Sequence, residues 1–491
     1  FKTILKLKYI HQMYFLYLFL FFPVFLLFAI FGAYRLWLLL LYRNSEKVKL
    51  PQKEIKEFPF TTIQIPIYNE FNVVERIVES AVKIDYPKEK FEIQILDDST
   101  DETKELVDRL VEIKRKEGFN IYAIRRDNRK GFKAGALKNG LKYAKGEFVA
   151  IFDADFIIPA DFLKRTLPYF EDPKVAFVQA KWDYINENEN LLTRIQAMLL
   201  RNHFWLEQEA KFKSGFFFNF NGTAGIWRKS AIIEAGNWHE DTLAEDLDLS
   251  IRSHLKGFKG IFLDDLLVSS ELPTDFNAFL IQQKRWTKGT FQVGLKLWKS
   301  ILKSNLDRED KLNILIHTLS PFLYLLNVIY FVIIWPLSRY SHILFGLLVL
   351  FLGMVNLYNI WTIDKKVRKD YLYEWRLKDM FYLIIVFTSF CFEGTKAVLE
   401  AIFKKDFIFE RTPKKGNGTR KAYSVKYEIG ISEILKIFYS FISIFLAFKL
   451  KIWGAIPWLF LFSLSSLYYF VKHINIVSTN VAIEKSVLTK R

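Results

Sequence analysis

Cysteine is almost absent from this chain, whose 491 residues include a single one, Cys391. A lone cysteine cannot form an internal disulfide, and its usual place is that of a small buried apolar residue. Internal repeats are absent too, which argues against a solenoid or propeller architecture. No long low-complexity linker divides the sequence. We therefore expect neither a disulfide framework nor thiol chemistry.

The charge of the chain is strongly positive. Lysine and arginine outnumber aspartate and glutamate by 70 to 53, which gives a formal net charge of +17. A basic chain can bind nucleic acid, but much of the excess lies in segments that flank apolar runs, such as KKVRKDYLYEWRLK. Anionic lipid headgroups account for that placement more directly. The sequence therefore predicts membrane lipids as partners, and no nucleic acid.

A long apolar segment lies near the N-terminus. Met13 to Leu41 is interrupted mainly by Arg35 and exceeds the roughly 20 residues that span a bilayer. It is too long for a signal-peptide core, and no small-residue cleavage site follows, so we expect a retained span. Arg43, Lys47 and Lys49 come next and place this flank in the cytoplasm by the positive-inside rule.

Apolar runs return in the C-terminal part of the chain. Phe381 to Phe403 has the length of a span but carries Glu393, Lys396 and Glu400 at near-helical spacing, which favours an amphipathic helix in the membrane interface over a span. Treating it as interfacial leaves the basic connections on the cytoplasmic side. Including the N-terminal one, five spans are then expected, and the other four are Leu319–Leu337, Ile343–Trp361, Ile434–Leu450 and Trp453–Phe470.

The intervening region has a different character. The short apolar runs TTIQIPI, FEIQILDD and FVAIFDAD alternate with helix-length segments such as Glu102 to Lys116. This alternation predicts a doubly wound α/β sheet. The predicted organisation is a transmembrane helix with its flank (1–49), a cytoplasmic α/β domain (50–310), two transmembrane helices with a basic loop (311–378), an interfacial helix with a loop (379–433), and two transmembrane helices with a tail (434–491).

Two aspartates follow the run FVAIFDAD. We expect its apolar part to be a strand buried in a parallel sheet, with Asp153 and Asp155 emerging on the same side at its carboxyl end, where open α/β sheets bind ligands. Carboxylates held so close repel unless a cation lies between them. Mg²⁺ or Mn²⁺ carrying substrate phosphates would relieve the repulsion. A pair of solvated loop aspartates is the alternative for an isolated DxD.

A second acidic pair, Asp97 and Asp98, follows FEIQIL at another carboxyl edge of the predicted sheet. These carboxylates could accept hydrogen bonds from a base or a ribose. Alternatively, Ser99 or Asp101 caps the next helix, and both interpretations can hold for different residues. In RDNRKGFKAGALKNG, Lys133 stands beside small residues at an apparent helix start, where it can face phosphate oxygens.

Two further motifs carry polar side chains suited to catalysis and binding. In TLAEDLDLSIR, Glu245 and Asp246 precede a helix, so a carboxylate there is either a general base for a hydroxyl nucleophile or an ordinary N-terminal capping group. In QQKRW, Gln282, Arg285 and Trp286 share one helical turn. The indole can stack on a sugar ring, or it can anchor a membrane interface.

In this order, the motifs resemble those of the membrane-embedded, processive family 2 glycosyltransferases, which carry an Asp, DxD, (T)ED and QxxRW series in a GT-A domain. IQIPIYNE, LDDSTD, FDADF, NFNGTAGIWR, EDLDL and ELPTDFNAF look closest to the cellulose synthase-like A and C enzymes, the mannan, glucomannan and xyloglucan-backbone synthases, and to bacterial relatives. The resemblance is dense over about residues 60 to 300. It implies a GT-A nucleotide-sugar-binding fold attached to a transmembrane helical region.

The resemblance also implies roles for individual residues. On the donor side it assigns Glu70, Asp97 and Asp98 to the nucleotide, Lys133 to the diphosphate, and Asp153 and Asp155 to donor and metal, Mg²⁺ or Mn²⁺. Asp246, beside Glu245, becomes the catalytic base. Gln282, Arg285 and Trp286 would bind donor phosphates and the terminal sugar of the acceptor, while Asn221, Gly222 and Thr223 would line the acceptor side.

One later segment also resembles a motif of this family, and we expect no regulatory domain after the spans. FERTPKKG looks like the donor-facing gating loop FxVTxK of cellulose synthases, with Phe409, Thr412 and Lys414 matching and Arg411 in place of valine. No regulatory domain of the cyclic-dinucleotide-binding kind follows the spans.

The expected activity is inverting transfer of a hexose from a nucleotide sugar to a growing β-1,4-linked mannan, glucomannan or glucan, with or without translocation of the product. GDP-mannose is the favoured donor, with GDP- or UDP-glucose next. The alternatives are transfer to a lipid, as in ceramide glucosyltransferases, and a chitin- or hyaluronan-synthase-like polymerase. A non-enzymatic scaffold would be expected to lose an acidic motif, and none is lost. The chain is expected in the plasma membrane of a prokaryote or an endomembrane of a eukaryote, with its catalytic domain in the cytoplasm.

Overall fold

The computed structural model describes residues 2–45, 54–335, 351, 353–363, 365, 377–404, 411–412, 414–416 and 431–488. The chain divides into two compact units. Unit 1 comprises Phe1–Trp37, Ser320–Glu400 and Val425–Arg491, and unit 2 comprises Leu38–Leu319 and Ala401–Ser424. Phe409, Ile343 and most of KKVRKDYLYEWRLK lie outside the described residues.

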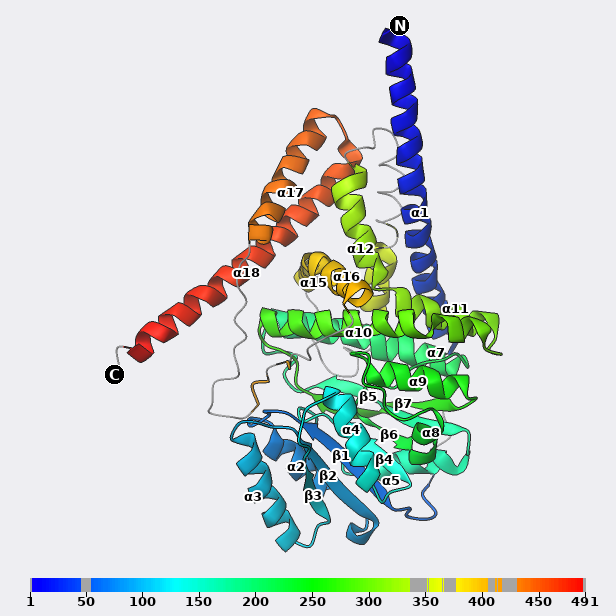
Figure 1. Ribbon diagram of the computed structural model, residues 1–491, viewed down its shortest axis with the longest axis vertical. Coiled ribbons are helices and arrows are strands. Elements are labelled where there is room, and N and C mark those ends of the chain that lie inside the picture. Colours follow the sequence, from blue (N-terminus) through cyan, green and yellow to red (C-terminus); the bar gives the residue numbers. More distant parts are fainter. Residues whose placement is uncertain are drawn as a thin grey trace. The chain divides into compact units, whose positions relative to one another are not determined.

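A seven-stranded sheet forms the centre of unit 2, with strand order β3-β2-β1-β4-β6-β5-β7 (Figure 1). β1 is paired in parallel with β2 and β4, whereas β6 is antiparallel to both β4 and β5. The sheet is therefore mixed. Its strands are β1 (Thr61–Ile67), β2 (Phe91–Asp97), β3 (Ile121–Ile124), β4 (Phe148–Ile151), β5 (Val175–Tyr184), β6 (Gly225–Arg228) and β7 (Lys259–Ser270).

The sequence predicted that β4 would have parallel strands on both sides, and this holds for only one of its two neighbours. β1 lies parallel on one side, but β6 runs antiparallel on the other, with Ile151 opposite Gly225. β6 directly follows the segment FNFNGTA, and Thr223 of this segment binds the N–H of Asp153, beyond the carboxyl end of β4. Because β6 is antiparallel to β4, the residues just before β6, including Gly222, lie at the carboxyl end of β4, where the DxD follows.

The strands are buried on both faces, and several of their polar residues pair with one another across the sheet. In β1, Ile63 and Ile65 are fully buried in the main hydrophobic core. On the alternate positions, Thr62 Oγ1 donates to Glu92 Oε1 at 2.8 Å and Gln64 Nε2 donates to Gln94 Oε1 at 3.0 Å. Such pairing removes the penalty of burying polar groups, which explains polar residues in a buried strand.

Helices pack against this sheet. α4 contacts β1 and β2, while α3 contacts β2 and β3. The helices of unit 2 are α2 (Val74–Val82), α3 (Thr103–Lys116), α4 (Phe132–Tyr143), α5 (Phe162–Thr166), α6 (Leu191–Arg201), α7 (Glu209–Lys213), α8 (Lys229–Glu234), α9 (Glu245–Leu255), α10 (Phe276–Lys303) and α11 (Arg308–Leu319). Three shorter turns are η1 (Lys88–Lys90), η2 (Leu167–Glu171) and the π-helical η3 (Asn202–Gln208).

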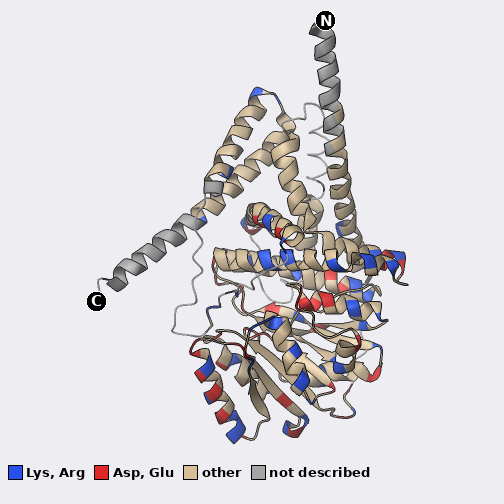
Figure 2. Cartoon of the chain, viewed as in Figure 1, with Lys and Arg blue, Asp and Glu red and all other residues tan. Residues whose placement is uncertain are grey.

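Unit 1 is helical in the part of the chain that the structure describes. A buried apolar cluster joins residues of α1, α12, η4, α17 and α18, and the rings of Phe331 and Phe462 stack within it. Figure 2 shows few charged residues on α12 and α17 and many on unit 2. The elements lying mainly in unit 1 are α1 (Lys2–Ser45), α12 (Phe322–Ile329), η4 (Tyr330–Ile334), α15 (Leu377–Ser389), α16 (Cys391–Phe403), α17 (Ile431–Lys449), η5 (Trp453–Ala455) and α18 (Ile456–Leu488).

Among the described residues, three helical segments are long and apolar enough to cross a membrane, namely Phe21–Asn44, Lys378–Phe403 and Trp453–Lys472. A fourth is added if Arg308–Leu319 and Phe322–Ile334 form one bent span. The segment expected in the interface, Phe381 to Phe403, therefore also has the length and composition of a span. These helices give the chain the character of a membrane protein.

Candidate active site

The DxD motif lies in a turn just beyond the end of β4. β4 ends at Ile151, and the N–H of Phe156 donates to the carbonyl of Asp153 at 3.1 Å. The alternation of side chains along an extended strand predicted that the two carboxylates share one face. The structure differs, because both lie in the turn that follows the strand. Thr223 holds the beginning of this turn, because its Oγ1 accepts a hydrogen bond from the N–H of Asp153 at 2.8 Å.

Each DxD carboxylate is paired with a lysine. Lys133 Nζ lies 2.6 Å from Asp153 Oδ1, and Lys414 Nζ lies 2.6 Å from Asp155 Oδ2. Lys414 also donates to the carbonyl of Glu271 at 2.7 Å. The structure thus brings together Lys133, Lys414 and both aspartates, as expected from the sequence, although these residues are far apart along the chain.

Glu70 lies at the same edge, after β1. Burial raises the pKa of its carboxyl to about 7, and the negative charges of Asp155 and Asp153 act in the same direction. The Arg411 guanidinium opposes this shift, with Nη1 at 3.7 Å from Glu70 Oε2. Arg411, the residue that departs from the gating-loop pattern, is therefore the cation facing Glu70.

Asp97 and Asp98 are each held by an arginine from the segment after β3. Asp98 accepts from Arg126 through both oxygens, at 2.9 and 2.5 Å. Asp97 has a fully buried side chain whose oxygens accept from the N–H of Ser99 at 3.0 Å and from Arg125 Nε at 2.9 Å. The Asp97 carboxylate is therefore engaged within the protein, and the nucleotide role expected for Asp97 and Asp98 stays a prediction.

Arginine contributes more to this edge than sequence reasoning anticipated. The Arg129 guanidinium lies over the ring of Tyr68, with Cζ 3.3 Å from the ring centroid. Arg125, Arg126 and Arg129 were not among the predicted site residues. The signal was present in IRRDNRKG, where three arginines follow a strand at the edge that also carries Asp97 and Asp98.

The first turn of α9 carries the candidate base. Glu245 and Asp246 are the first two residues of this helix, where a carboxylate interacts favourably with the helix dipole. Burial raises the pKa of Asp246 to about 7, and the neighbouring Glu245 raises it further while Lys133 lowers it. Burial also raises the pKa of Glu245. A carboxylate with a pKa near neutrality is suited to accept a proton from a hydroxyl.

Gly222 connects Asp246 to Lys133. The carbonyl of Gly222 accepts from Lys133 Nζ at 2.9 Å, and a Cβ at this position would lie 2.9 Å from Asp246 Oδ2. Its φ of +81° is in the left-handed region that favours glycine. The pKa of Lys133 is raised because its carboxylate neighbours, Asp153, Glu245 and Asp246, outweigh the opposing effect of burial.

Asn221 and Thr223 make internal contacts. Thr223 is fully buried and binds the backbone of Asp153, so it supports the DxD turn. In the Asn221 side chain, Oδ1 lies 2.9 Å from His203 Nε2 and Nδ2 donates to the carbonyl of Asn219 at 3.1 Å. Gly222 adjoins the candidate base, and the acceptor-side role expected for these three residues stays a prediction.

QQKRW lies within α10, as the spacing predicted. Gln282 is buried, and its Oε1 has no hydrogen-bond partner among the described residues, which marks it as a group that a ligand could satisfy. Trp286 is half-buried. Burial lowers the pKa of the Arg285 guanidinium, and four carboxylates oppose that shift: Glu245, Asp153, Asp246 and Asp155. Arg285 therefore faces the same acidic centre as the DxD and α9.

The residues at the DxD fit a hard divalent cation shared with a ligand. No group of three or more histidine, cysteine, aspartate or glutamate side chains arranged to hold a metal occurs among the described residues. Asp153 and Asp155 each keep one carboxylate oxygen without a hydrogen-bond or ion-pair partner in that part of the chain. Mg²⁺ and Mn²⁺ commonly take one or two carboxylates and complete their coordination with phosphate oxygens and water.

The fold and the acidic motifs define a class, the GT-A glycosyltransferases. Two family models match the chain: Glycosyl transferase family 2 over residues 62–233 and Glycosyl transferase family group 2 over residues 148–364. The region 62–364 therefore has the sequence character of a family 2 glycosyltransferase.

Relatives of known name agree. The chain is 45% identical over 252 residues to glucomannan 4-beta-mannosyltransferase 7 of Arabidopsis thaliana, covering 50% of this chain and 45% of that protein. It is 48% identical over 245 residues to glucomannan 4-beta-mannosyltransferase 9 of the same plant, covering 49% of this chain and 46% of the relative. The matched region thus spans about half the length of these relatives.

A solved structure supports the fold. The mannosyltransferase PcManGT from Pyrobaculum calidifontis, in complex with GDP-Man and Mn²⁺, matches with a TM-score of 0.50 and 18% sequence identity, covering 78% of this chain and 100% of that chain. At this identity the likeness concerns the fold alone.

Proposed function

We propose that this protein transfers mannose from GDP-mannose to the 4-hydroxyl group of a growing β-1,4-linked mannan or glucomannan, with inversion at the anomeric carbon. GDP- or UDP-glucose is the next donor in order of expectation. The observation that carries the proposal is the joint placement of Asp246, Lys133 and the DxD around Gly222. The similarity to glucomannan 4-beta-mannosyltransferases supports the choice of sugar.

Asp246 acts as the general base. It removes the proton of the acceptor hydroxyl as that oxygen attacks the anomeric carbon, and the bond to the nucleoside diphosphate breaks. A single displacement converts an α-linked donor into a β-glycoside. The raised pKa of Asp246 suits this role because a weakly acidic carboxyl holds the transferred proton well at neutral pH.

The cations of the site serve the leaving group. Lys133, Arg285 and Lys414 surround the acidic centre and can bind diphosphate oxygens. Asp153 and Asp155 would hold Mg²⁺ or Mn²⁺, which neutralises the charge that develops on the departing diphosphate. Asp98, Glu70 and Arg129 stand at the strand ends where the nucleoside is expected, and Trp286 offers an indole on which the terminal sugar can stack.

The protein is proposed to cross the membrane several times and to hold unit 2 in the cytoplasm, where nucleotide sugars are made. The apolar helices and the basic residues that flank them support this topology. A catalytic domain attached to a membrane region would hold its acceptor at the membrane surface, as a secreted polysaccharide or a lipid-linked product requires.

Product analysis tests the proposal. The purified full-length chain is incubated with labelled GDP-mannose, GDP-glucose or UDP-glucose in Mn²⁺, with Asp246→Asn as the matched control. We expect label from GDP-mannose in high-mass material that endo-β-1,4-mannanase digests, and none with the variant. Turnover of UDP-glucose alone, with the label extracted into organic solvent, would replace the polymer proposal with transfer to a lipid.

A further inference from the structure

The helix between β5 and β6 contains a wide turn. η3 (Asn202–Gln208) is π-helical and lies between α6 and α7. Short π-helical turns inside α-helices are frequent at functional sites. Residues five apart meet across such a turn, and here the Nε2 atoms of His203 and Gln208 are 2.9 Å apart. The wide turn therefore presents two polar side chains together at one place.

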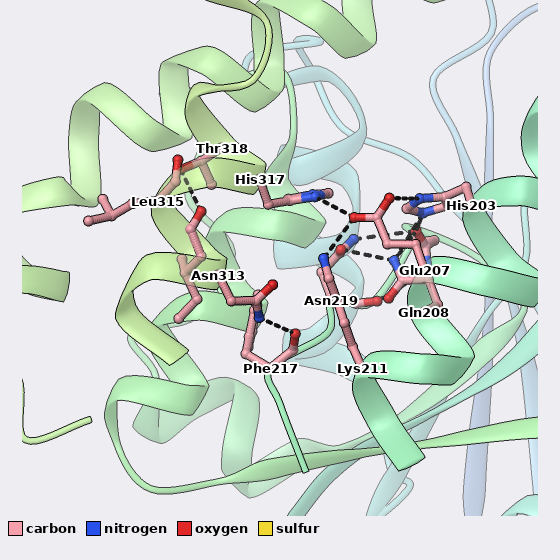
Figure 3. A network of polar contacts seen from close by, with 12 residues as sticks. His203, Glu207, Gln208, Lys211, Phe217, Asn219, Asn313, Leu315, His317 and Thr318 are labelled. Carbon is pink, nitrogen blue, oxygen red and sulfur yellow. Dashed lines mark hydrogen bonds and ion pairs between the residues drawn. The ribbon is translucent and has the colours of Figure 1, made fainter. Parts of the chain in front are cut away.

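These side chains contact the segment that leads to Gly222 (Figure 3). His203 Nε2 lies 2.9 Å from Asn221 Oδ1, and Gln208 Nε2 donates to Asn219 Oδ1 at 3.0 Å. On its other side, the N–H of Asn221 donates to Gln179 Oε1 at 2.9 Å. Asn221 is thus held between η3 and β5.

The buried carboxylate of Glu207 lies next to His203, with Oε2 3.6 Å from His203 Nδ1. Glu207 accepts from Lys211 Nζ at 2.7 Å and lies 3.0 Å from His317 Nδ1, as Figure 3 shows. The exposed fractions of the Glu207 and Lys211 side chains are 5% and 3%, whereas that of His203 is 26%. His203 is therefore the most exposed member of a network in which Glu207 and Lys211 are buried.

Asn221 precedes Gly222, the residue that contacts Lys133 and adjoins the candidate base Asp246. Gly222 binds Lys133 and adjoins Asp246 Oδ2, and Thr223 binds the backbone of Asp153. Consecutive Cα atoms are about 3.8 Å apart. A shift of the Asn221 side chain is therefore transmitted to the base and to the DxD turn, and displacements near 1 Å can cost about 10²-fold in rate.

We propose that His203 is a positioning residue of the transfer reaction: through Asn221, it holds Asn219–Thr223 in place against Asp246. This inference rests on the proposed transferase function, because it assigns a role within that site. No donor-binding residue of the site contacts His203 among the described residues. Loss of the histidine should therefore lower kcat and leave nucleotide binding intact.

The test compares substitutions that keep or remove a polar atom near the position of His203 Nε2. His203→Gln keeps a side-chain amide there, and His203→Leu has a similar volume but no polar atom. We expect kcat of His203→Leu to fall about tenfold or more and that of His203→Gln to stay within about threefold of wild type. Calorimetric Kd values for GDP and UDP should stay within about threefold in both.

A double substitution shows whether the effect passes through Asn221. If it does, His203→Leu combined with Asn221→Ala should be no slower than the slower single variant, because coupled residues do not contribute additively. Equal loss of kcat in His203→Leu and His203→Gln would overturn the proposal, as would a parallel loss of nucleotide affinity. Should His203→Leu fail to fold, His203→Asn takes its place, since its shorter side chain removes the polar atom that contacts Asn221.

The measurement uses whichever nucleotide sugar the wild type turns over. A wild type that transfers glucose and not mannose would overturn the choice of donor sugar, whereas the ratio between the Gln and Leu variants would still decide the role of His203. The two failures are therefore distinguishable.

Discussion

Lys414 places its ammonium nitrogen 2.6 Å from Asp155 Oδ2, and thereby occupies one oxygen of the second DxD carboxylate. The same ammonium donates to the carbonyl of Glu271. The segment that carries it is fixed by Glu271, whose carboxylate accepts from the N–H groups of Lys415 and Gly416 at 2.8 and 2.9 Å. A lysine from one of the last segments of unit 2 is thus directed at the predicted metal ligand.

This pairing predicts that Lys414→Ala strengthens metal binding in the absence of nucleotide. The ammonium and a divalent cation compete for Asp155, and an ion pair worth about 1 kcal/mol corresponds to a change of about fivefold in the Kd for Mn²⁺. Donor affinity should fall, because Lys414 is also proposed to bind the diphosphate. Titration of Mn²⁺ by electron paramagnetic resonance, with and without GDP, measures both effects.

The neighbouring lysine is the matched control for that experiment. Lys415 pairs with Glu189 at 2.6 Å, and its side chain is exposed. Lys415→Ala should leave Mn²⁺ binding unchanged. Weaker binding of Mn²⁺ by Lys414→Ala would show that the lysine does not compete for the metal site.

A second prediction concerns the base. Asp246→Asn should bind donor normally and lose transfer by about 10²-fold or more, the usual effect of removing a general base. Because burial raises the pKa of Asp246, the ionised carboxylate destabilises the fold above about pH 7, so the variant should unfold at no lower a temperature than wild type at pH 8. Asp265→Asn, at an exposed ion pair with Arg165, is the control. Normal turnover by Asp246→Asn would remove this residue from the mechanism.

The pH dependence of kcat/KM follows from the same carboxyl. A base works only when deprotonated, and the pKa of Asp246 is raised to about 7. Activity should therefore fall about tenfold per pH unit as the pH decreases below 7 and level off above it. The pKa of Glu70 is also raised to about 7, so Glu70→Gln is needed to separate the two groups. A profile that stays flat from pH 5.5 to 8 in wild type would contradict a base with this pKa.

Gly222→Ala tests the close approach of the backbone to Asp246. A Cβ there would lie 2.9 Å from Asp246 Oδ2, so we expect kcat to fall about tenfold or more as the base is displaced. Gly118→Ala is a matched control, since its φ of +88° is similar but no atom lies within 4 Å of the added Cβ. Both variants should lose comparable stability in thermal unfolding, on the order of 1 kcal/mol. Equal activities of the two variants would show that the contact with Asp246 is unimportant.

Metal removal gives a further prediction. If Asp153 and Asp155 hold Mg²⁺ or Mn²⁺, a chelator should abolish transfer, and either ion should restore it. Asp155→Asn should raise the Mn²⁺ concentration needed for half-maximal activity, because an amide is a weaker ligand than a carboxylate. Full turnover in excess chelator would show that Lys133, Lys414 and Arg285 suffice for the leaving group.

Local sequence patterns were enough to predict three of the strands, β1, β2 and β4, and the acidic motifs. TTIQIPI coincides with β1, and Glu102 to Lys116 differs by one residue from α3, because buried strands and amphipathic helices have characteristic patterns. Spacing within QQKRW was also sufficient, since the turn of an α-helix fixes which residues share a face.

Local patterns could not predict which side chains from distant segments pair with one another in the fold. Nothing near Asp97 indicates that Arg125 will occupy it, because the partner comes from the neighbouring strand end. The internal roles of Asn221 and Thr223 depend on His203 and on the DxD backbone, which the fold brings together from distant segments. The antiparallel β6 is equally invisible locally, since strand direction is set by the path of the whole chain.

The composition of unit 2 has a consequence for the order in which the protein is made. Leu38–Leu319 and Ala401–Ser424 belong to this unit, while Ser320–Glu400 between them belongs to unit 1. A ribosome therefore completes all strands, the DxD and Asp246 well before it reaches Arg411 and Lys414. Until the intervening helices have been synthesised, Glu70 and Asp155 remain without these two cations. The nascent chain can thus form its sheet early, but the ion pairs of Arg411 and Lys414 at the ends of β1 and β4 can form only after α12, α15 and α16 have been synthesised.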